Sequence, residues 1–134
     1  MKPIHILLVE DNEGDVIFTT EALYESNFPF TISVVKDGWQ ATLLLNKKDK
    51  YADEIMPDLV ILDLNLPKMN GIEVLKNIKT NKYTRHIPVI MLSTSAFEKD
   101  ITLCMQCEAD CFMTKPMEAE AFRRQLKELK GITV

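Results

Sequence analysis

Four short apolar runs in the sequence are followed, at once or after one residue, by side chains that could carry out chemistry. The run ILLV leads into Glu10 and Asp11, LVIL into Asp63, and VIML into Ser93, while CFM is followed after one residue by Lys115. Together these positions supply three carboxylates, a hydroxyl and an ammonium. Such a set suits the binding of a cation and the transfer of a charged group such as phosphoryl.

The carboxylates could not lie together without compensation. Asp63 follows an apolar run that is typical of a buried strand, where a bare charge is costly. Two carboxylates ~4 Å apart repel by roughly 4 kcal/mol at an effective dielectric constant near 20, and one lysine cannot balance three of them. A hard divalent cation could, and ligands that are all oxygen suit Mg²⁺. With a cation present, Asp63 could act as a nucleophile toward a phosphoryl group, and Lys115 would offset the charge on the transferred oxygens.

The elements that would position these residues follow from the alternation of apolar runs and helical patterns. We expect strands at 4–9, 31–35, 59–63, 88–92 and 111–113. We expect helices at 14–26, after a cap at Asp37, from near Asn70, at 97–108, and around Ala119, Phe122, Leu126 and Leu129, with an extended loop at 46–58. Strict alternation predicts an α/β fold, a doubly wound five-stranded parallel sheet covered on both faces. Ligands of such sheets bind beyond the carboxyl ends of the strands, where the polar residues fall.

Composition narrows the class of protein. The chain has 134 residues, a net charge of −4 and no basic run, which argues against a nucleic-acid surface. Nothing approaches the ~18 consecutive apolar residues of a membrane helix. Three cysteines, an odd number, fit a reducing compartment better than a disulfide framework. We therefore expect a single domain over residues 1–134, cytoplasmic, with no membrane insertion and no direct contact with nucleic acid.

Taken together, the segments LLVEDN, VILDLNLPKMNG, VIMLSTSA and FMTKP resemble the receiver domain of two-component response regulators. The resemblance covers essentially the whole chain. It is strongest to single-domain regulators similar to those paired with bacterial phytochrome histidine kinases, which often have a comparably long loop before the third strand. The resemblance implies a flavodoxin-like sheet with strand order 2-1-3-4-5.

The same resemblance implies roles for the acidic residues. Asp63 would be the phosphoacceptor. Asp11, Asp63 and the backbone carbonyl of Asn65 would hold Mg²⁺, with Glu10 acting through water. Lys115 would pair first with Asp63 and then with the phosphoryl group.

It also implies a switch. Ser93 would bind a phosphoryl oxygen, and Phe112 matches the aromatic position that turns inward when the hydroxyl residue moves. Asn65 and Ser95 match positions that tune hydrolysis of the phosphorylated state. The bond between Lys115 and Pro116 is usually cis in similar domains.

The function implied is a stand-alone switch that is not an enzyme toward other molecules and catalyses only its own phosphorylation and dephosphorylation. It would be phosphorylated by a sensor histidine kinase or phosphotransfer protein and signal to a downstream protein. Homodimerisation through the fourth helix, fifth strand and fifth helix is a further expectation. One alternative is a constitutive docking module on the same fold. A phosphatase with an aspartyl-phosphate intermediate usually has a second Asp where Asn65 stands, and the acidic EDNEGD loop disfavours a flavodoxin-type electron carrier.

Three features are open to more than one interpretation. Cys104, Cys107 and Cys111 could form a metal or redox site, but small buried apolar residues are the better explanation. Glu108 stands where similar domains have Gly; because a left-handed helix cap disfavours Glu, we expect the helix to end differently here. Trp39 could be incidental packing or a binding anchor.

Overall fold

The computed structural model describes residues 2–129 and 131–132. Within them the chain forms five strands, five α-helices and one short 3₁₀ helix in alternating order. The strands are β1 (Ile4–Val9), β2 (Phe30–Val35), β3 (Leu59–Asp63), β4 (Val89–Ser93) and β5 (Cys111–Thr114). The helices are α1 (Glu13–Glu25), α2 (Gly38–Leu45), η1 (Asp49–Tyr51), α3 (Gly71–Thr80), α4 (Glu98–Gln106) and α5 (Ala119–Glu128).

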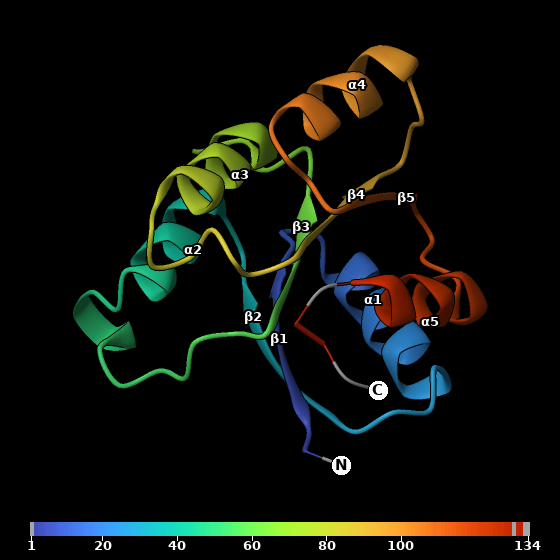
Figure 1. Ribbon diagram of the computed structural model, residues 1–134, viewed down its shortest axis with the longest axis horizontal. Coiled ribbons are helices and arrows are strands. Elements are labelled where there is room, and N and C mark those ends of the chain that lie inside the picture. The colour runs from blue at the N-terminus through green and yellow to red at the C-terminus, as the bar shows by residue number, and fades with distance from the viewer. Residues whose placement is uncertain (1, 130, 133–134) are drawn as a thin grey trace.

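The strands form one parallel sheet in the order β2-β1-β3-β4-β5, which confirms the predicted flavodoxin-like fold. Figure 1 shows the sheet between two layers of helices. Side chains of α1 and α5 pack on one face, and side chains of α2, α3 and α4 pack on the other. Every residue of the inner strands β3 and β4 is buried, as a parallel sheet covered on both faces requires.

The predicted boundaries hold to within a residue or two, with one omission. The loop expected at 46–58 contains the helical turn η1. Its Tyr51 packs partly buried against the core on the α2 side, and its hydroxyl donates to Oε1 of Gln40 at 2.7 Å. The polar residues around Tyr51 hide this turn from a reading of hydrophobic periodicity.

The expectation for Glu108 was wrong. Glu108 adopts the left-handed conformation, with φ of 69°, directly after α4. The backbone N–H of Glu108 donates to the carbonyl of Met105, and that of Ala109 donates to the carbonyl of Cys104. This is the Schellman arrangement that glycine usually completes. Ala109 and Cys104 are both buried in the same cluster, so their burial stabilises the helix end despite the glutamate.

The three thiols do not converge on one site. Cys104 belongs to the core cluster on the α2, α3 and α4 face, while Cys111 belongs to the cluster on the α1 and α5 face. Burial raises the pKa of the Cys104 thiol to about 11 and also raises the pKa of Cys111. Two of these residues are therefore buried thiols in different layers, in line with the apolar interpretation.

Two remaining points concern the exposure of Trp39 and the hydrophobicity of the helices. Trp39 lies on α2 with half of its surface exposed. Among residues 2–129 and 131–132, the structure contains no helix with the length and hydrophobicity to traverse a bilayer.

Candidate functional site

Three of the predicted acidic residues meet at the carboxyl end of the sheet. One carboxylate oxygen from each of Glu10, Asp11 and Asp63 lies within 4.8 Å of the others. Glu10 and Asp63 are buried, whereas Asp11 is exposed. The expected convergence of these carboxylates is confirmed.

Strand register explains why these residues meet. Val9 of β1 is paired with Leu62 of β3, so Glu10 and Asp63 both follow at the next step along neighbouring strands. The chain then turns into α1, whose first residues are held by Asn12. The side chain of Asn12 accepts a hydrogen bond from the backbone N–H of Asp15 at 2.9 Å. Asn12 caps the helix, so Asp11 is not needed as a cap and its carboxylate is left at the cluster.

Lys115 reaches this cluster from the other end of the chain. Its Nζ lies 2.7 Å from Oε1 of Glu10, 2.9 Å from Oδ2 of Asp15 and 3.0 Å from Oδ2 of Asp63. The backbone N–H of Lys115 donates to the carbonyl of Ser93 at 2.8 Å, and the bond to Pro116 is cis, as the resemblance implies. The ammonium is therefore held by three carboxylates at once.

These contacts alter the acid–base properties of both partners. Burial raises the pKa of Glu10 to about 7; the hydrogen bond from Lys115 opposes the rise, and the nearby Asp63 adds to it. Burial alone would lower the pKa of Lys115, but its hydrogen bonds to Glu10, Asp15 and Asp63 outweigh burial and raise the pKa. The lysine is thus charged at neutral pH, and the cluster keeps an excess of negative charge.

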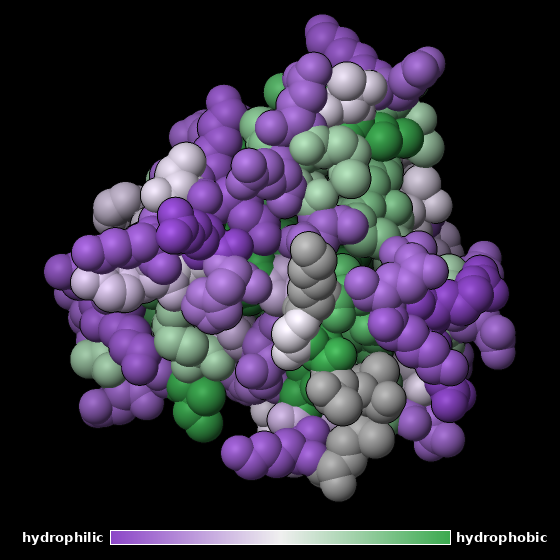
Figure 2. All heavy atoms as spheres, in the orientation of Figure 1, coloured by the Kyte–Doolittle hydropathy of each residue, from purple (hydrophilic) through white to green (hydrophobic). Residues whose placement is uncertain are grey.

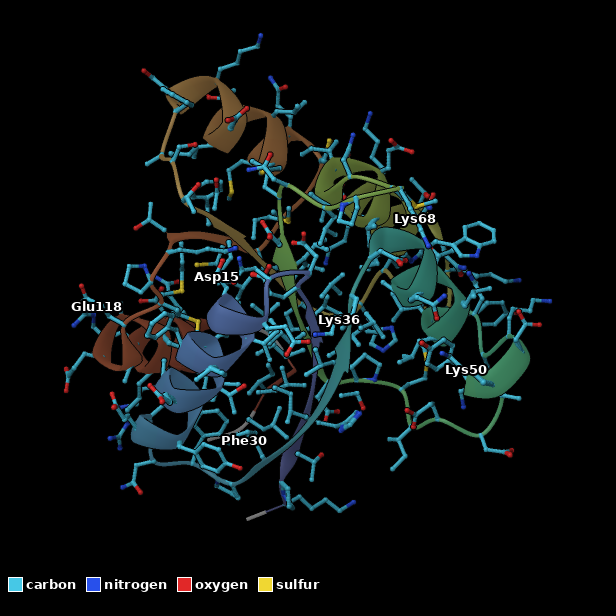
Figure 3. All side chains as sticks on the ribbon, turned by 180° about the vertical axis from the view of Figure 1, so that it is seen from behind. Asp15, Phe30, Lys36, Lys50, Lys68 and Glu118 are labelled. Carbon is cyan, nitrogen blue, oxygen red and sulfur yellow. The ribbon has the colours of Figure 1, made fainter. Side chains whose placement is uncertain are left out.

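Asp15 is the member of the site that the sequence analysis missed. Figure 3 labels it in the first turn of α1. It is 100 residues from Lys115 in sequence, and an acidic residue in the first turn of a helix is usually explained by the helix dipole. The available signal is helical spacing: a residue three positions after the Asn12 cap lies on the same side of the helix start as the acidic cluster.

The two oxygens of Asp63 have different partners. Oδ1 accepts from the backbone N–H of Asn65 at 3.0 Å, and Oδ2 accepts from Lys115. Ser93 is fully buried, and its hydroxyl oxygen accepts from the backbone N–H of Ser95 at 3.2 Å. β4 neighbours β3 in the sheet, so Ser93 and Asp63 end adjacent strands.

The loop between β3 and α3 lies very close to the end of β3. A Cβ placed on Gly71 would lie 2.4 Å from the carbonyl oxygen of Asp63, and one on Gly38 would lie 2.1 Å from the carbonyl oxygen of Met69. A Cβ and a non-bonded backbone oxygen are essentially never found at such separations. Both positions therefore require glycine for reasons of space.

Phe112 lies on β5, where it pairs with Met91 two residues before the end of the strand. It is half-buried and packs against the core on the α2, α3 and α4 side. It also lines a surface hollow together with Ala96 and Ile101. Figure 2 shows apolar residues gathered on this side of the molecule, between α4 and α5.

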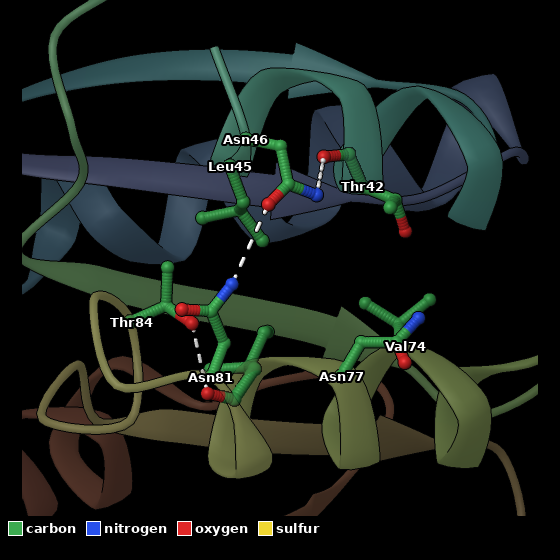
Figure 4. Close-up of a pocket in the computed structure, with 8 residues that line it drawn as sticks. Thr42, Leu45, Asn46, Val74, Asn77, Asn81 and Thr84 are labelled. Atoms are coloured by element: carbon green, nitrogen blue, oxygen red, sulfur yellow. Dashed lines mark hydrogen bonds between the residues drawn. The ribbon is translucent and has the colours of Figure 1, made fainter. Parts of the chain in front are cut away.

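A separate cavity of about 20 Å³ lies between α2 and α3, as Figure 4 shows. Asn81 donates to Asn46 across it at 3.5 Å, and Asn46 donates to the carbonyl of Thr42. Its volume corresponds to about one water molecule, too small for an organic cofactor.

The acidic cluster fits a hard divalent cation. It offers carboxylate oxygens at close range, and the single ammonium of Lys115 offsets part of their charge. Oxygen donors in this number are typical of Mg²⁺ and Mn²⁺ sites. The chemistry of the residues present therefore suits such an ion.

Comparison with known proteins gives the same fold and family. The model of the response regulator receiver domain matches residues 6–127. Response regulator Rcp1 of Synechocystis sp. is 37% identical over 127 residues, covering 95% of this chain and 82% of Rcp1. Its structure has been solved in a Mn²⁺-bound form, with a TM-score of 0.82 to this chain at 33% identity, covering 98% of this chain and 99% of that one.

Two further solved structures are similar. The bacteriophytochrome response regulator AtBRR has a TM-score of 0.88 at 34% identity and covers 100% of this chain and 97% of its own. The phosphorylated cyanobacterial phytochrome response regulator RcpA has a TM-score of 0.82 at 38% identity, over 96% of this chain and 92% of its own. With strand order, acidic cluster and family match in agreement, this chain belongs to the response regulator receiver domain family.

Proposed function

We propose that this protein is a stand-alone, cytoplasmic response regulator that accepts a phosphoryl group on Asp63. The donor would be a phosphohistidine of a sensor histidine kinase or of a phosphotransfer protein. The protein would act as a switch, without enzymatic activity toward other molecules. The relatives named as phytochrome response regulators make a light-sensing kinase a reasonable first candidate for the donor.

In the proposed reaction a carboxylate oxygen of Asp63 attacks the phosphorus as the bond from phosphorus to the donor histidine breaks. The product is an acyl phosphate. Lys115, 3.0 Å from Asp63, would donate to a phosphoryl oxygen, and the hydroxyl of Ser93 would donate to another. Each of these donors offsets charge on the transferred group.

A divalent cation such as Mg²⁺ would be held by Asp11, Asp63 and the backbone carbonyl of Asn65, with Glu10 acting through water. When bound, the ion supplies charge stabilisation for the phosphoryl oxygens. The close grouping of three carboxylates supports this assignment, as does the Mn²⁺-bound form of Rcp1.

The output would follow from a change in packing. Phosphorylation would replace the single charge of the Asp63 carboxylate with a phosphoryl group of about −1.5 to −2 charges, and Ser93 would move toward it. Phe112 would then turn inward and alter the hollow that it lines with Ala96 and Ile101. The surface formed by α4, β5 and α5 would bind a downstream protein or a second copy of the chain. Asn65 and Ser95 flank the phosphoryl position and would tune hydrolysis.

One observation supports the proposal above the others: Asp63 is buried, grouped with two further carboxylates and hydrogen-bonded to a lysine. A carboxylate that served only structure would be paired with a cation and left without additional negative neighbours, because each neighbour raises its electrostatic energy. The arrangement is the one expected of an acceptor awaiting a cation and an anionic group.

The test is phosphorylation with labelled acetyl phosphate in the presence of Mg²⁺. We expect the wild type to be labelled and Asp63→Asn to remain unlabelled, with Asp53→Asn, an exposed loop carboxylate, labelled like the wild type. Full labelling of Asp63→Asn would remove Asp63 from the acceptor role.

Beryllium fluoride separates the switch from a constitutive docking module. In Mg²⁺ it should raise the melting temperature of the wild type and leave that of Asp63→Asn unchanged, because only the native carboxylate can bind it as a phosphoryl mimic. An unchanged melting temperature of the wild type would favour the docking module.

A further inference from the structure

The three contacts of Lys115 are not equivalent. An ammonium has three N–H donors, and here three carboxylates lie within hydrogen-bond distance of Nζ. Two of them, Glu10 and Asp63, belong to the cluster of carboxylates that could hold a cation. The third, Asp15, is not part of that cluster.

Asp15 is also fixed in place. Its backbone N–H donates to the side chain of Asn12, which caps α1, and its own side chain is 31% exposed. The carboxylate of Asp15 is therefore carried by a capped helix start, outside the cluster at the strand ends.

A cation bound to the cluster would draw on the oxygens of Glu10 and Asp63 and repel the ammonium of Lys115. An ammonium of this kind is charged and carries a long, flexible side chain, so it needs another acceptor to stay near the acceptor carboxylate. Asp15 is the contact that a cation in the cluster leaves free.

We propose that Asp15 is a positioning residue for Lys115: it retains the ammonium at the start of α1 when a cation and a phosphoryl group engage the strand-end carboxylates. The proposal rests on the proposed function of Asp63 for its kinetic part. Its metal-binding part concerns the unphosphorylated protein and stands independently.

Glu13 provides a matched control. It lies in the same turn of α1 as Asp15 and carries the same charge. Its side chain is 83% exposed, however, and forms its ion pair with Lys36 and not with Lys115. Glu13→Ala and Asp15→Ala each remove one negative charge from this turn. A difference between the two variants therefore reports on contact with Lys115 and excludes a general loss of charge.

The first measurement is calorimetric titration of the unphosphorylated protein with Mg²⁺. In Asp15→Ala the ammonium has only Glu10 and Asp63 left, so it competes more strongly with the ion. We expect the dissociation constant to rise about threefold relative to Glu13→Ala, a size typical of a partly exposed ion pair.

The second measurement is the rate of phosphorylation over a range of acetyl phosphate concentrations in saturating Mg²⁺. We expect Asp15→Ala to lower the maximal rate about fivefold with little change in KM, because the ammonium is no longer held where the transition state needs it. Asp15→Asn keeps an oxygen acceptor and should fall between Asp15→Ala and the wild type. Glu13→Ala should behave as the wild type.

Equal behaviour of Asp15→Ala and Glu13→Ala in both measurements would overturn the proposal, provided that their melting temperatures show both to be folded. A wild type that takes no label would contradict the proposed function alone, and the Mg²⁺ titration would still decide the role of Asp15.

Discussion

The ammonium of Lys115 lies 2.7 Å from the carboxylate of Glu10, which is only 2% exposed. Burial raises the pKa of Glu10 to about 7 from an ordinary value of 4.5, although Lys115 opposes the rise. The folded protein therefore binds a proton between these two pH values that the unfolded chain has released. A group whose pKa is raised by folding contributes stability that is present at low pH and lost as pH rises through the folded value.

For the metal-free protein we therefore expect the contribution of Glu10 to the free energy of unfolding to fall by about 1–3 kcal/mol between pH 4.5 and pH 7. Urea denaturation in EDTA at several pH values measures this. Glu10→Gln should lose that part of the slope, and a variant with an unchanged slope would contradict the assignment. Mg²⁺ binds ionised carboxylates, so Mg²⁺ at about ten times its dissociation constant should raise the free energy of unfolding by about 1.4 kcal/mol.

A second prediction concerns a partly buried ion pair away from the site. Nζ of Lys79, whose side chain is 8% exposed, lies 2.9 Å from Oδ2 of Asp110 and donates to the carbonyl of Ile87. The same oxygen of Asp110 accepts from the backbone N–H of Val89. Asp110→Ala should lower the free energy of unfolding by about 2 kcal/mol. The loss is smaller than that expected for a fully buried pair because Asp110 is itself partly exposed.

Equilibrium urea denaturation measures this loss. The matched control is Glu120→Ala, which removes an exposed partner of Arg124 at 4.0 Å and should change stability by less than about 0.5 kcal/mol. Asp110→Ala should still be labelled by acetyl phosphate. Equal stability of the two variants would show that the pair between Lys79 and Asp110 contributes nothing beyond a fully exposed one.

A third prediction follows from the left-handed backbone at Glu108. Glycine adopts this conformation without a Cβ penalty, so Glu108→Gly should raise the free energy of unfolding by about 0.5–1 kcal/mol. The control is Glu98→Gly in the first turn of α4, where helical geometry makes glycine unfavourable and stability should fall. A loss of stability in both variants would mean that Glu108 makes a compensating interaction.

The sheet could be predicted because its signals are local. β1 and β3 have the predicted bounds because unbroken apolar runs end at polar residues, and the Asp37 cap is confirmed by its hydrogen bond from the backbone N–H of Gln40. The grouping of Glu10, Asp11 and Asp63 follows from parallel strands once their order is known.

The features that the sequence did not predict depend on contacts between residues that are far apart in the chain or that only the folded structure brings together. Asp15 joins the site through a lysine 100 residues away, and its helical spacing from Asn12 does not identify that partner. η1 depends on Tyr51 reaching Gln40, and Glu108 is tolerated because Ala109 and Cys104 are buried together. In each case tertiary packing outweighed the preference of a single residue.

Substitution of Gly71 or Gly38 is a second way in which the geometry of the site can be disrupted. A methyl group on Gly71 would push the start of α3 away from the carbonyl of Asp63, and one on Gly38 would displace the backbone at Met69. A substitution can therefore disrupt the site without changing any ionisable residue. An alanine at either position, neutral and small, would deform the backbone at Asp63 or in the loop that follows it, so an inventory of charges alone would misjudge which sequences preserve the geometry of the site.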